Sequence, residues 1–175
     1  MRTFLLFPLV FVASFGSWGR ELQAQSSSRR VESTLATLYE TFSFDRGQEP
    51  DWTRMRALFL DGATFVAPVT KGTPPHGVNA EQFVRDFREW VLTSADAKAG
   101  FRERIVHMRI DRFGHLAHAY VTFEGFVPGE VKARKRGIDS IQLVLDNDRW
   151  KVASFTTQYE SPGLVMPSRF LSSPQ

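Results

Sequence analysis

The first apolar pattern in the chain has the spacing of a helix. Over residues 31–44, apolar side chains recur at positions i, i+3, i+4 and i+7, the signature of one buried helical face. Gly47 and Pro50 then interrupt the pattern. We therefore predict a helix over residues 31–44. Its buried face consists of Leu35, Leu38, Tyr39 and Phe42.

Two more helices are predicted before the period changes. Asp51 can cap a short second helix, which Asp61 and Gly62 end. Asn79 and Gln82 have the spacing of a capping box, and the helix that they open runs to about Ser94. Between these helices, residues 63–69 form a first predicted strand. The apolar faces are Trp52, Met55, Leu58 and Phe59 in the second helix, and Phe83, Phe87, Trp90 and Val91 in the third.

The second half of the chain has the alternation typical of strands. Four such runs follow one another, separated by glycine-rich or polar turns. Helices come first and a strand meander comes last, which favours an α+β fold with an antiparallel sheet. The four predicted strands cover residues 102–113, 116–127, 137–146 and 149–160.

The N-terminal segment has the pattern of a secretory signal peptide. A short positive start precedes an apolar run from Phe4 to Phe15, and a small and polar stretch ends near Ala24. About 12 apolar residues are too few for a bilayer span, which needs roughly 20. We expect a signal peptide over 1–24, a disordered lead-in over 25–30, one domain over 31–160 and a C-terminal extension over 161–175. The expected location is periplasmic or secreted.

Charge and composition narrow the partners. Removing residues 1–24 takes away two arginines and one glutamate, which lowers the formal net charge from +3 to +2. So small a charge gives no electrostatic case for nucleic acid. The chain has no cysteine, and therefore neither a disulfide framework nor a thiolate nucleophile. No later segment is apolar and long enough to cross a membrane, so we expect no membrane association after signal cleavage.

The order of these elements, with "DWTRMRALFLDGATFV" early and "GIDSIQLVLDNDRWKV" late, resembles the nuclear transport factor 2-like superfamily. This cone-shaped fold is shared by ketosteroid isomerase, scytalone dehydratase and SnoaL-type polyketide cyclases. The resemblance implies an apolar pocket between the helices and the concave face of the sheet, and a homodimer through the outer face. Helix residues expected to line the pocket are Trp52, Phe59, Phe83, Phe87 and Trp90.

The resemblance also places candidate polar residues. Asp139 corresponds to the protonated acid of ketosteroid isomerase, and Tyr39 lies on or near the position of its tyrosine. The position of the general base holds Ala67, which cannot transfer a proton. Asp139 is therefore either an exposed strand-end acid, satisfied by backbone or nearby basic residues, or a desolvated acid that donates a hydrogen bond into the pocket.

Two histidines are further candidates. His107 and Asp111 share one face of a strand, and His118, Tyr120 and Glu124 share a face of the next one. If these faces coincide, a histidine–carboxylate pair would suit general base catalysis. The alternative is the solvent side of a half-exposed sheet. No tight ligand spacing supports a metal site here, and no cofactor motif is present.

Two functions remain open from the sequence. The first is an exported domain that binds a small apolar ligand, or acts as a non-catalytic module. The second is a cofactor-independent lyase or isomerase, with His118 or His107 as base and with Asp139 and Tyr39 as hydrogen-bond donors. The position of Ala67 favours the first.

Overall fold

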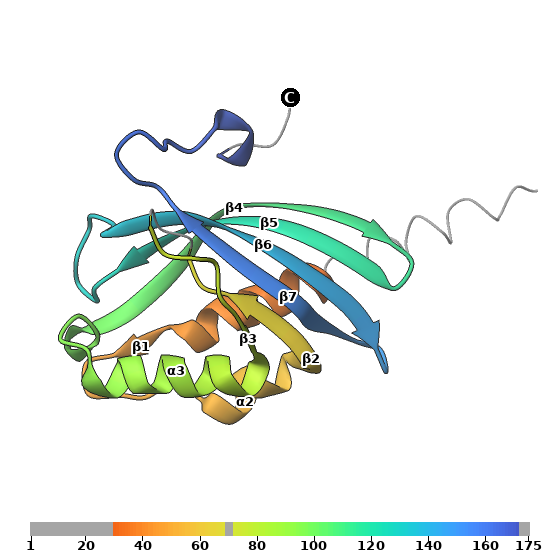
Figure 1. Ribbon diagram of the computed structural model, residues 1–175, viewed down its shortest axis with the longest axis horizontal. Coiled ribbons are helices and arrows are strands. Elements are labelled where there is room, and N and C mark those ends of the chain that lie inside the picture. Colours follow the sequence, from red (N-terminus) through yellow and green to blue (C-terminus); the bar gives the residue numbers. More distant parts are fainter. Residues whose placement is uncertain (1–29, 69–71, 172–175) are drawn as a thin grey trace, which may run out of the picture.

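A seven-stranded sheet with helices on one side makes up the part of the chain that the computed structural model describes, residues 30–68 and 72–171 (Figure 1). The strand order is β1-β4-β5-β6-β7-β2-β3. Every pair is antiparallel except β2 with β7, which is parallel. The predicted α+β class with a mostly antiparallel sheet is confirmed. The predicted signal peptide lies outside the described residues.

The elements follow the predicted order. A first helix is described over residues 30–42. The remaining helical elements are α2 (Trp52–Ala57), α3 (Ala80–Thr93), η1 (Ala97–Ala99) and η2 (Ser168–Phe170). The strands are β1 (Phe44–Asp45), β2 (Phe59–Val66), β3 (Gly77–Asn79), β4 (Gly100–Phe113), β5 (Leu116–Phe126), β6 (Lys135–Asp146) and β7 (Arg149–Tyr159). No helix among the described residues has both the length and the apolar character needed to cross a membrane.

Side-chain caps start α2 and α3 where the sequence predicts. Asp51 Oδ1 accepts a hydrogen bond from the backbone N–H of Arg54 at 2.9 Å. Asn79 Oδ1 accepts one from the backbone N–H of Gln82, also at 2.9 Å. Each bond satisfies one of the free N–H groups of a first helical turn. The Gln82 side chain does not complete a capping box, because its Oε1 accepts a hydrogen bond from Arg85 instead of from the backbone N–H of Asn79.

The second helix is shorter than predicted. It ends at Ala57, whereas the sequence pattern extended it to Asp61. Phe59 already belongs to β2, whose pairing with β7 starts there, and Val152 N donates to Leu58 O at 2.9 Å. An apolar pair of residues at a helix end fits a buried strand equally well, so sequence periodicity could not separate the two.

The four long strands match their predictions to within two residues at each end. The turn between β6 and β7 consists of Asn147 and Asp148, whose φ angles are +45° and +60°. Positive φ at both central residues is the type I′ geometry that suits the twist of a two-residue hairpin. The two strands therefore continue as one long hairpin, which contributes five side chains to the cavity described below.

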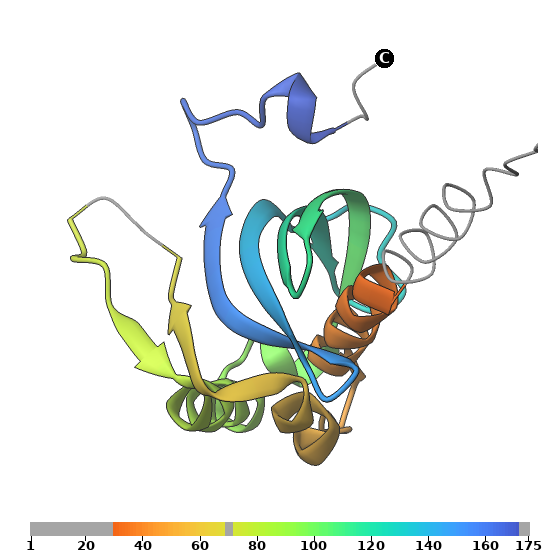
Figure 2. The same ribbon diagram turned by 90° about the vertical axis from the view of Figure 1, so that its right-hand side faces the viewer.

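The sheet has a concave core side and an outer side. Figure 2 shows β6 and β7 (blue) bending so that the concave side faces the helices. Alternate residues of β5 and β6, among them Val121 and Ile141, are buried there. The C-terminal segment lies on the outer side (Figure 1), where Thr122 Oγ1 donates to Phe170 O at 2.5 Å.

A β-bulge in β4 exchanges the two sides. The register with β5 shifts between Ile105 and His107. Ile105 packs on the core before the bulge and Met108 after it, whereas Val106 is 41% exposed. Regular alternation would place Val106 on the same face as Met108, but the one extra residue of the bulge reverses the alternation.

A substitution at Gly137 can test how tightly the concave side is packed. A Cβ at this position would lie 2.8 Å from the Phe123 ring and 3.0 Å from Gln158 O. We expect Gly137→Ala to lower the free energy of unfolding by about 1–3 kcal/mol through overpacking, measured by urea denaturation. Gly62→Ala is the matched control, because its Cβ would meet nothing within 4 Å. Equal stability of the two variants would contradict this packing.

Candidate functional site

A cavity of about 320 Å³ lies between the helices and the concave side of the sheet. Its walls are mainly aromatic and come from the first helix, α3 and strands β4, β5 and β7. Phe83 and Phe87 stack with a ring-centroid distance of 6.2 Å, as do Phe87 and Trp90 at 5.6 Å. The aromatic residues of the wall are Phe42, Phe83, Phe87, Trp90, Phe101, Phe123 and Phe155.

Five polar side chains also line this cavity. They project from the concave side of three strands: Glu103 from β4, Lys135 and Asp139 from β6, and Thr157 and Tyr159 from β7. β6 and β7 are neighbours in the sheet, and Asp139 lies opposite Thr157 in their register. The meander therefore concentrates polar groups from distant parts of the chain within an otherwise apolar space.

Asp139 is the most deeply buried of these groups, at 1% exposure. The Tyr39 hydroxyl, from the first helix, donates a hydrogen bond to Oδ2. Thr157 Oγ1 donates one to Oδ1 at 2.6 Å. Burial raises the pKa of Asp139 to about 7, although the two hydrogen bonds act in the opposite direction because they stabilise the carboxylate.

The structure thus answers the question that the sequence left open about Asp139. Its carboxyl is buried, and its partners are two side-chain hydroxyls. None of the ion pairs among the described residues involves it. The structure brings Asp139 and Tyr39 together, as the resemblance implied. Burial also raises the pKa of the Tyr39 hydroxyl, as does the neighbouring Asp139.

Glu103 is a site residue that sequence reasoning missed. Burial raises the pKa of its carboxyl well above the ordinary value, and the charge of Asp139 raises this pKa further. The positive charge of Lys135 has the opposite effect and lowers the pKa of Glu103. No side chain in the described part of the protein donates a hydrogen bond to this carboxyl. Phe101 and Ile105, two residues away on either side, were the available signal, because they mark the concave face of β4 before the bulge.

Lys135 and Tyr159 lie together at the rim of the cavity. The Lys135 ammonium is 5.4 Å from the centroid of the Tyr159 ring, within the range of a cation–π contact. Burial raises the pKa of the Tyr159 hydroxyl, with smaller contributions from the Glu103 and Asp139 carboxyls. The tyrosine therefore stays protonated, as a hydrogen-bond donor, over the physiological range.

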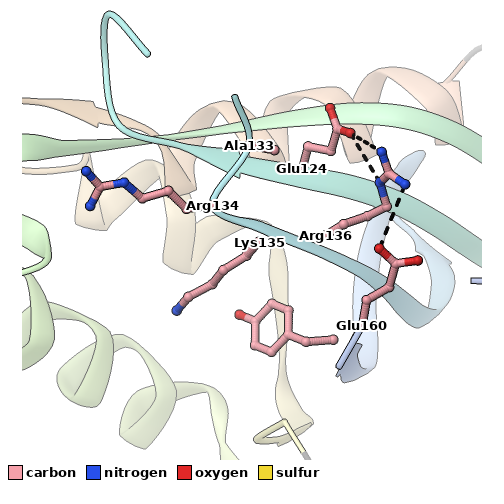
Figure 3. A pocket seen from close by; sticks show the side chains of 7 residues that line it. Glu124, Ala133, Arg134, Lys135, Arg136 and Glu160 are labelled. Atoms are coloured by element: carbon pink, nitrogen blue, oxygen red, sulfur yellow. Dashed lines mark hydrogen bonds and ion pairs between the residues drawn. The ribbon is translucent and has the colours of Figure 1, made fainter. Parts of the chain in front are cut away.

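The neighbouring arginines belong to a separate group on the outer side (Figure 3). Arg136 donates to Glu124 at 2.7 Å and lies 3.8 Å from Glu160. Arg104 holds the other Glu124 oxygen at 2.6 Å, and these two arginines lower the pKa of Glu124. Lys135 points away from this group of ion pairs in Figure 3. The two basic residues of β6 thus serve opposite sides of the sheet.

Neither candidate histidine lines the cavity. The predicted coincidence of polar faces is present, since Asp111 lies opposite His118 in the register and His107 opposite Thr122. This face is the outer one, and there His118 Nε2 lies 2.9 Å from Ser140 Oγ. His107 Nε2 is buried without a hydrogen-bond partner among the described residues. His107 and His118 are therefore not placed to act as a base in the cavity. His118 alternates with the buried residues Ala117 and Ala119 of β5, and His107 follows the bulge of β4, opposite Thr122.

Three of the five predicted helix residues line the cavity: Phe83, Phe87 and Trp90. Phe59 does not, because it lies behind the wall, 5.9 Å from the Phe83 ring. Trp52 does not either. Its ring packs edge-on against Phe87, with ring centroids 5.8 Å apart, and its Nε1 donates to Glu49.

The position that the resemblance assigned to a general base is also outside the cavity. Ala67 follows the end of β2 and is exposed, and its backbone N–H donates to His76 O at 3.4 Å. The next residue, Pro68, reaches the cavity wall. Within the described residues, no group of three or more metal-ligating side chains could hold a metal ion.

Comparisons with known proteins identify the fold. No protein-family model matches the chain, and no curated protein matches it significantly. A Streptomyces avermitilis protein proposed to be a dehydratase of the nuclear transport factor 2-like family has a TM-score of 0.61 and 14% identity, covering 79% of this chain and 99% of its own. A nuclear transport factor 2-like protein of unknown function from Shewanella baltica has a TM-score of 0.54 and 17% identity, with coverages of 78% and 95%. Another, from Pseudomonas putida, has a TM-score of 0.61 and 7% identity, with coverages of 77% and 87%. The chain has the nuclear transport factor 2-like fold.

The pKa of Asp139 predicts how stability depends on pH. The folded state holds this proton up to about pH 7, whereas the unfolded chain loses it near pH 4. The free energy of unfolding should therefore fall as the pH rises from 4 to 7, by at most about 1.4 kcal/mol per pH unit from this group. We expect Asp139→Asn, which cannot ionise, to flatten this fall in urea denaturation at pH 5, 6, 7 and 8.

Asp111→Asn is the matched control, because that carboxyl is exposed on the outer side and paired with Arg109. Its stability curve should run parallel to that of the wild type. A curve for Asp139→Asn that also runs parallel to the wild type would contradict the burial of an ionisable Asp139.

Proposed function

We propose that this protein is exported and binds a small, largely apolar organic molecule in the aromatic cavity, with the carboxyl of Asp139 as the polar anchor at its base. One observation carries the proposal: a carboxyl at 1% exposure lines a cavity of about 320 Å³ whose walls are mainly aromatic. Small-molecule sites in proteins have this composition, an apolar pocket with a few convergent polar groups.

The free-energy cost of burying the Asp139 carboxyl supports a ligand-binding role for this position. A buried carboxyl lowers stability unless its hydrogen bonds and its charge are compensated. Tyr39 and Thr157 satisfy one oxygen each, so the group is held in a fixed orientation. A domain that needed only a core could bury an apolar residue here at no such cost. Binding of a ligand by this carboxyl would explain why a residue that lowers stability is kept at this position.

The export part of the proposal is supported by the sequence alone. The positive start, the apolar run and the small residues before Ala24 form the pattern of a cleaved signal peptide. The proposed mature protein begins near Gln25 and acts in a periplasm or outside the cell. Intact-mass measurement of the protein from the exported fraction tests this, with loss of residues 1–24 expected and an uncleaved chain contradicting it.

A second candidate function is proton transfer without a cofactor, as in an isomerase or a dehydratase. The observation that favours it is the presence of two carboxyls of raised pKa, Glu103 and Asp139, in one cavity. Glu103 would be the base in place of a histidine, and Asp139 the acid. Exchange of the protons next to the carbonyl of 4-phenylbutan-2-one in D₂O, abolished by Glu103→Gln, would favour this function over binding alone.

Blocking the rim tests occupation of the cavity. We expect Lys135→Trp to place a bulky ring over the opening and to remove a ligand that co-purifies with the exported protein, detected by native mass spectrometry. Lys132→Trp is the control, because this lysine is exposed and does not line the cavity. The absence of any bound mass in the wild type, or its equal retention in both variants, would contradict the proposal.

A further inference from the structure

We infer that the ligand of the cavity is an organic cation, an amine whose ammonium group lies between Glu103 and Asp139 and whose apolar body contacts the aromatic walls. This inference rests on the proposed function and adds to it the charge of the ligand. It follows from the balance of charge within the cavity and from the chemistry of its walls.

The lining residues include more acidic than basic groups. Glu103 and Asp139 are two acids, and Lys135 is the single base among the residues that line the cavity in the described structure. The groups that face them from the first helix and β7 are hydroxyls, those of Tyr39, Thr157 and Tyr159. Lys135 forms no ion pair with either acid within 4.0 Å among the described contacts. The cavity therefore contains acidic groups without matching positive partners.

The walls suit a cation as well. The faces of aromatic rings carry partial negative charge and attract ammonium groups, most strongly in a site shielded from water. The protein already shows such a contact at the rim, where the Lys135 ammonium lies over the Tyr159 ring. A ligand ammonium deeper in the cavity would find the same kind of surface, together with two carboxylates.

An anionic ligand fits this site poorly. It would have to lie beside Glu103 and Asp139, and the nearby arginines are already engaged. Arg134 is bound by Glu130 through two hydrogen bonds, at 2.5 and 2.8 Å, and Arg136 by Glu124 and Glu160. Only Lys135 would remain to attract an anion.

Neutral and cationic ligands differ in how their binding depends on pH. Burial raises the pKa of both carboxyls, and the charge of Asp139 raises the pKa of Glu103 further. A cation binds their ionised forms and so displaces protons, which makes its affinity rise with pH. A neutral hydrogen-bond acceptor binds the protonated forms, and its affinity falls with pH. The sign of the pH dependence therefore reports the charge of the ligand.

Three probes that share one skeleton test the inference: 4-phenylbutylamine, 4-phenylbutan-1-ol and 4-phenylbutyrate. Their dissociation constants are measured by isothermal titration calorimetry with the purified protein at pH 6 and pH 8. The ammonium group stays charged at both values, since its pKa is near that of lysine, about 10.4. We expect the amine to bind about tenfold more tightly than the alcohol at pH 8, and more tightly at pH 8 than at pH 6, with release of protons. The carboxylate should bind most weakly.

Two variants give opposite expected effects. Glu103→Gln removes one acid without changing its size, and should weaken amine binding about tenfold, a larger change than for alcohol binding. Lys135→Gln removes the competing cation at the rim and should strengthen amine binding several-fold. Lys132→Gln, a charge change of the same kind outside the cavity, should change neither. Circular dichroism confirms that each variant is folded.

The possible outcomes separate the two proposals. A preference for the amine that rises with pH and is lost in Glu103→Gln supports the inference. Equal or tighter binding of the alcohol or of the carboxylate overturns the assigned charge and leaves a ligand-binding cavity. If none of the three probes binds, the proposed function fails, and the inference fails with it.

Discussion

The burial of one carboxyl constrains the structure more than any other interaction. Asp139 lies under the sheet at 1% exposure, where an unsatisfied carboxyl would be strongly unfavourable. It is tolerated because the first helix delivers the Tyr39 hydroxyl to one oxygen and β7 delivers Thr157 to the other. The β6–β7 hairpin and the first helix, which is distant in sequence, must therefore be in place together. Removing either hydroxyl would leave a buried acceptor without its donor, and such losses are costly.

Two glycines make room for aromatic rings of the cavity wall. Phe123 lies against the backbone at Gly137, where a Cβ would be 2.8 Å from the ring. Phe101 approaches Gly125 in a similar way, with its ring 3.1 Å from where a Cβ would be. The aromatic side chains thus form the walls of the space without filling it. Glu103, Lys135 and Tyr159, which are only partly buried or exposed, also line this space, and they are the polar groups that the proposed ligand could reach.

Several features could be predicted from the sequence because they depend on local patterns. The helices follow from a period of 3.6, the meander from a period of two, and the caps at Asp51 and Asn79 from their side chains. The pairing of Tyr39 with Asp139 came from the resemblance to a known fold. The sequence could not predict which apolar side chains line the cavity. Phe59 and Phe83 have the same apolar character, but of the two Phe83 alone faces the cavity.

Glu103 and the histidines show what local patterns could not give. Alternation assigns residues to faces only while a strand is regular, and the bulge after Ile105 breaks that regularity. Glu103 and His107 are four residues apart, so a regular strand would place them on the same side. Because the bulge lies between them, they lie on opposite sides of the sheet. The parallel pairing of β2 with β7 is equally non-local, since it joins strands that are separated by most of the domain.

The most direct measurement of the central claim is the protonation of Asp139 itself. Carbon NMR of the protein labelled at the aspartate carboxyl carbons gives one titration curve per residue, and the Asp139 resonance is assigned by its absence in Asp139→Asn. A buried carboxyl that lines an aromatic cavity should titrate with a pKa of about 7. Titration near the ordinary aspartate value of about 3.9 would show a solvated group and would contradict the proposed site.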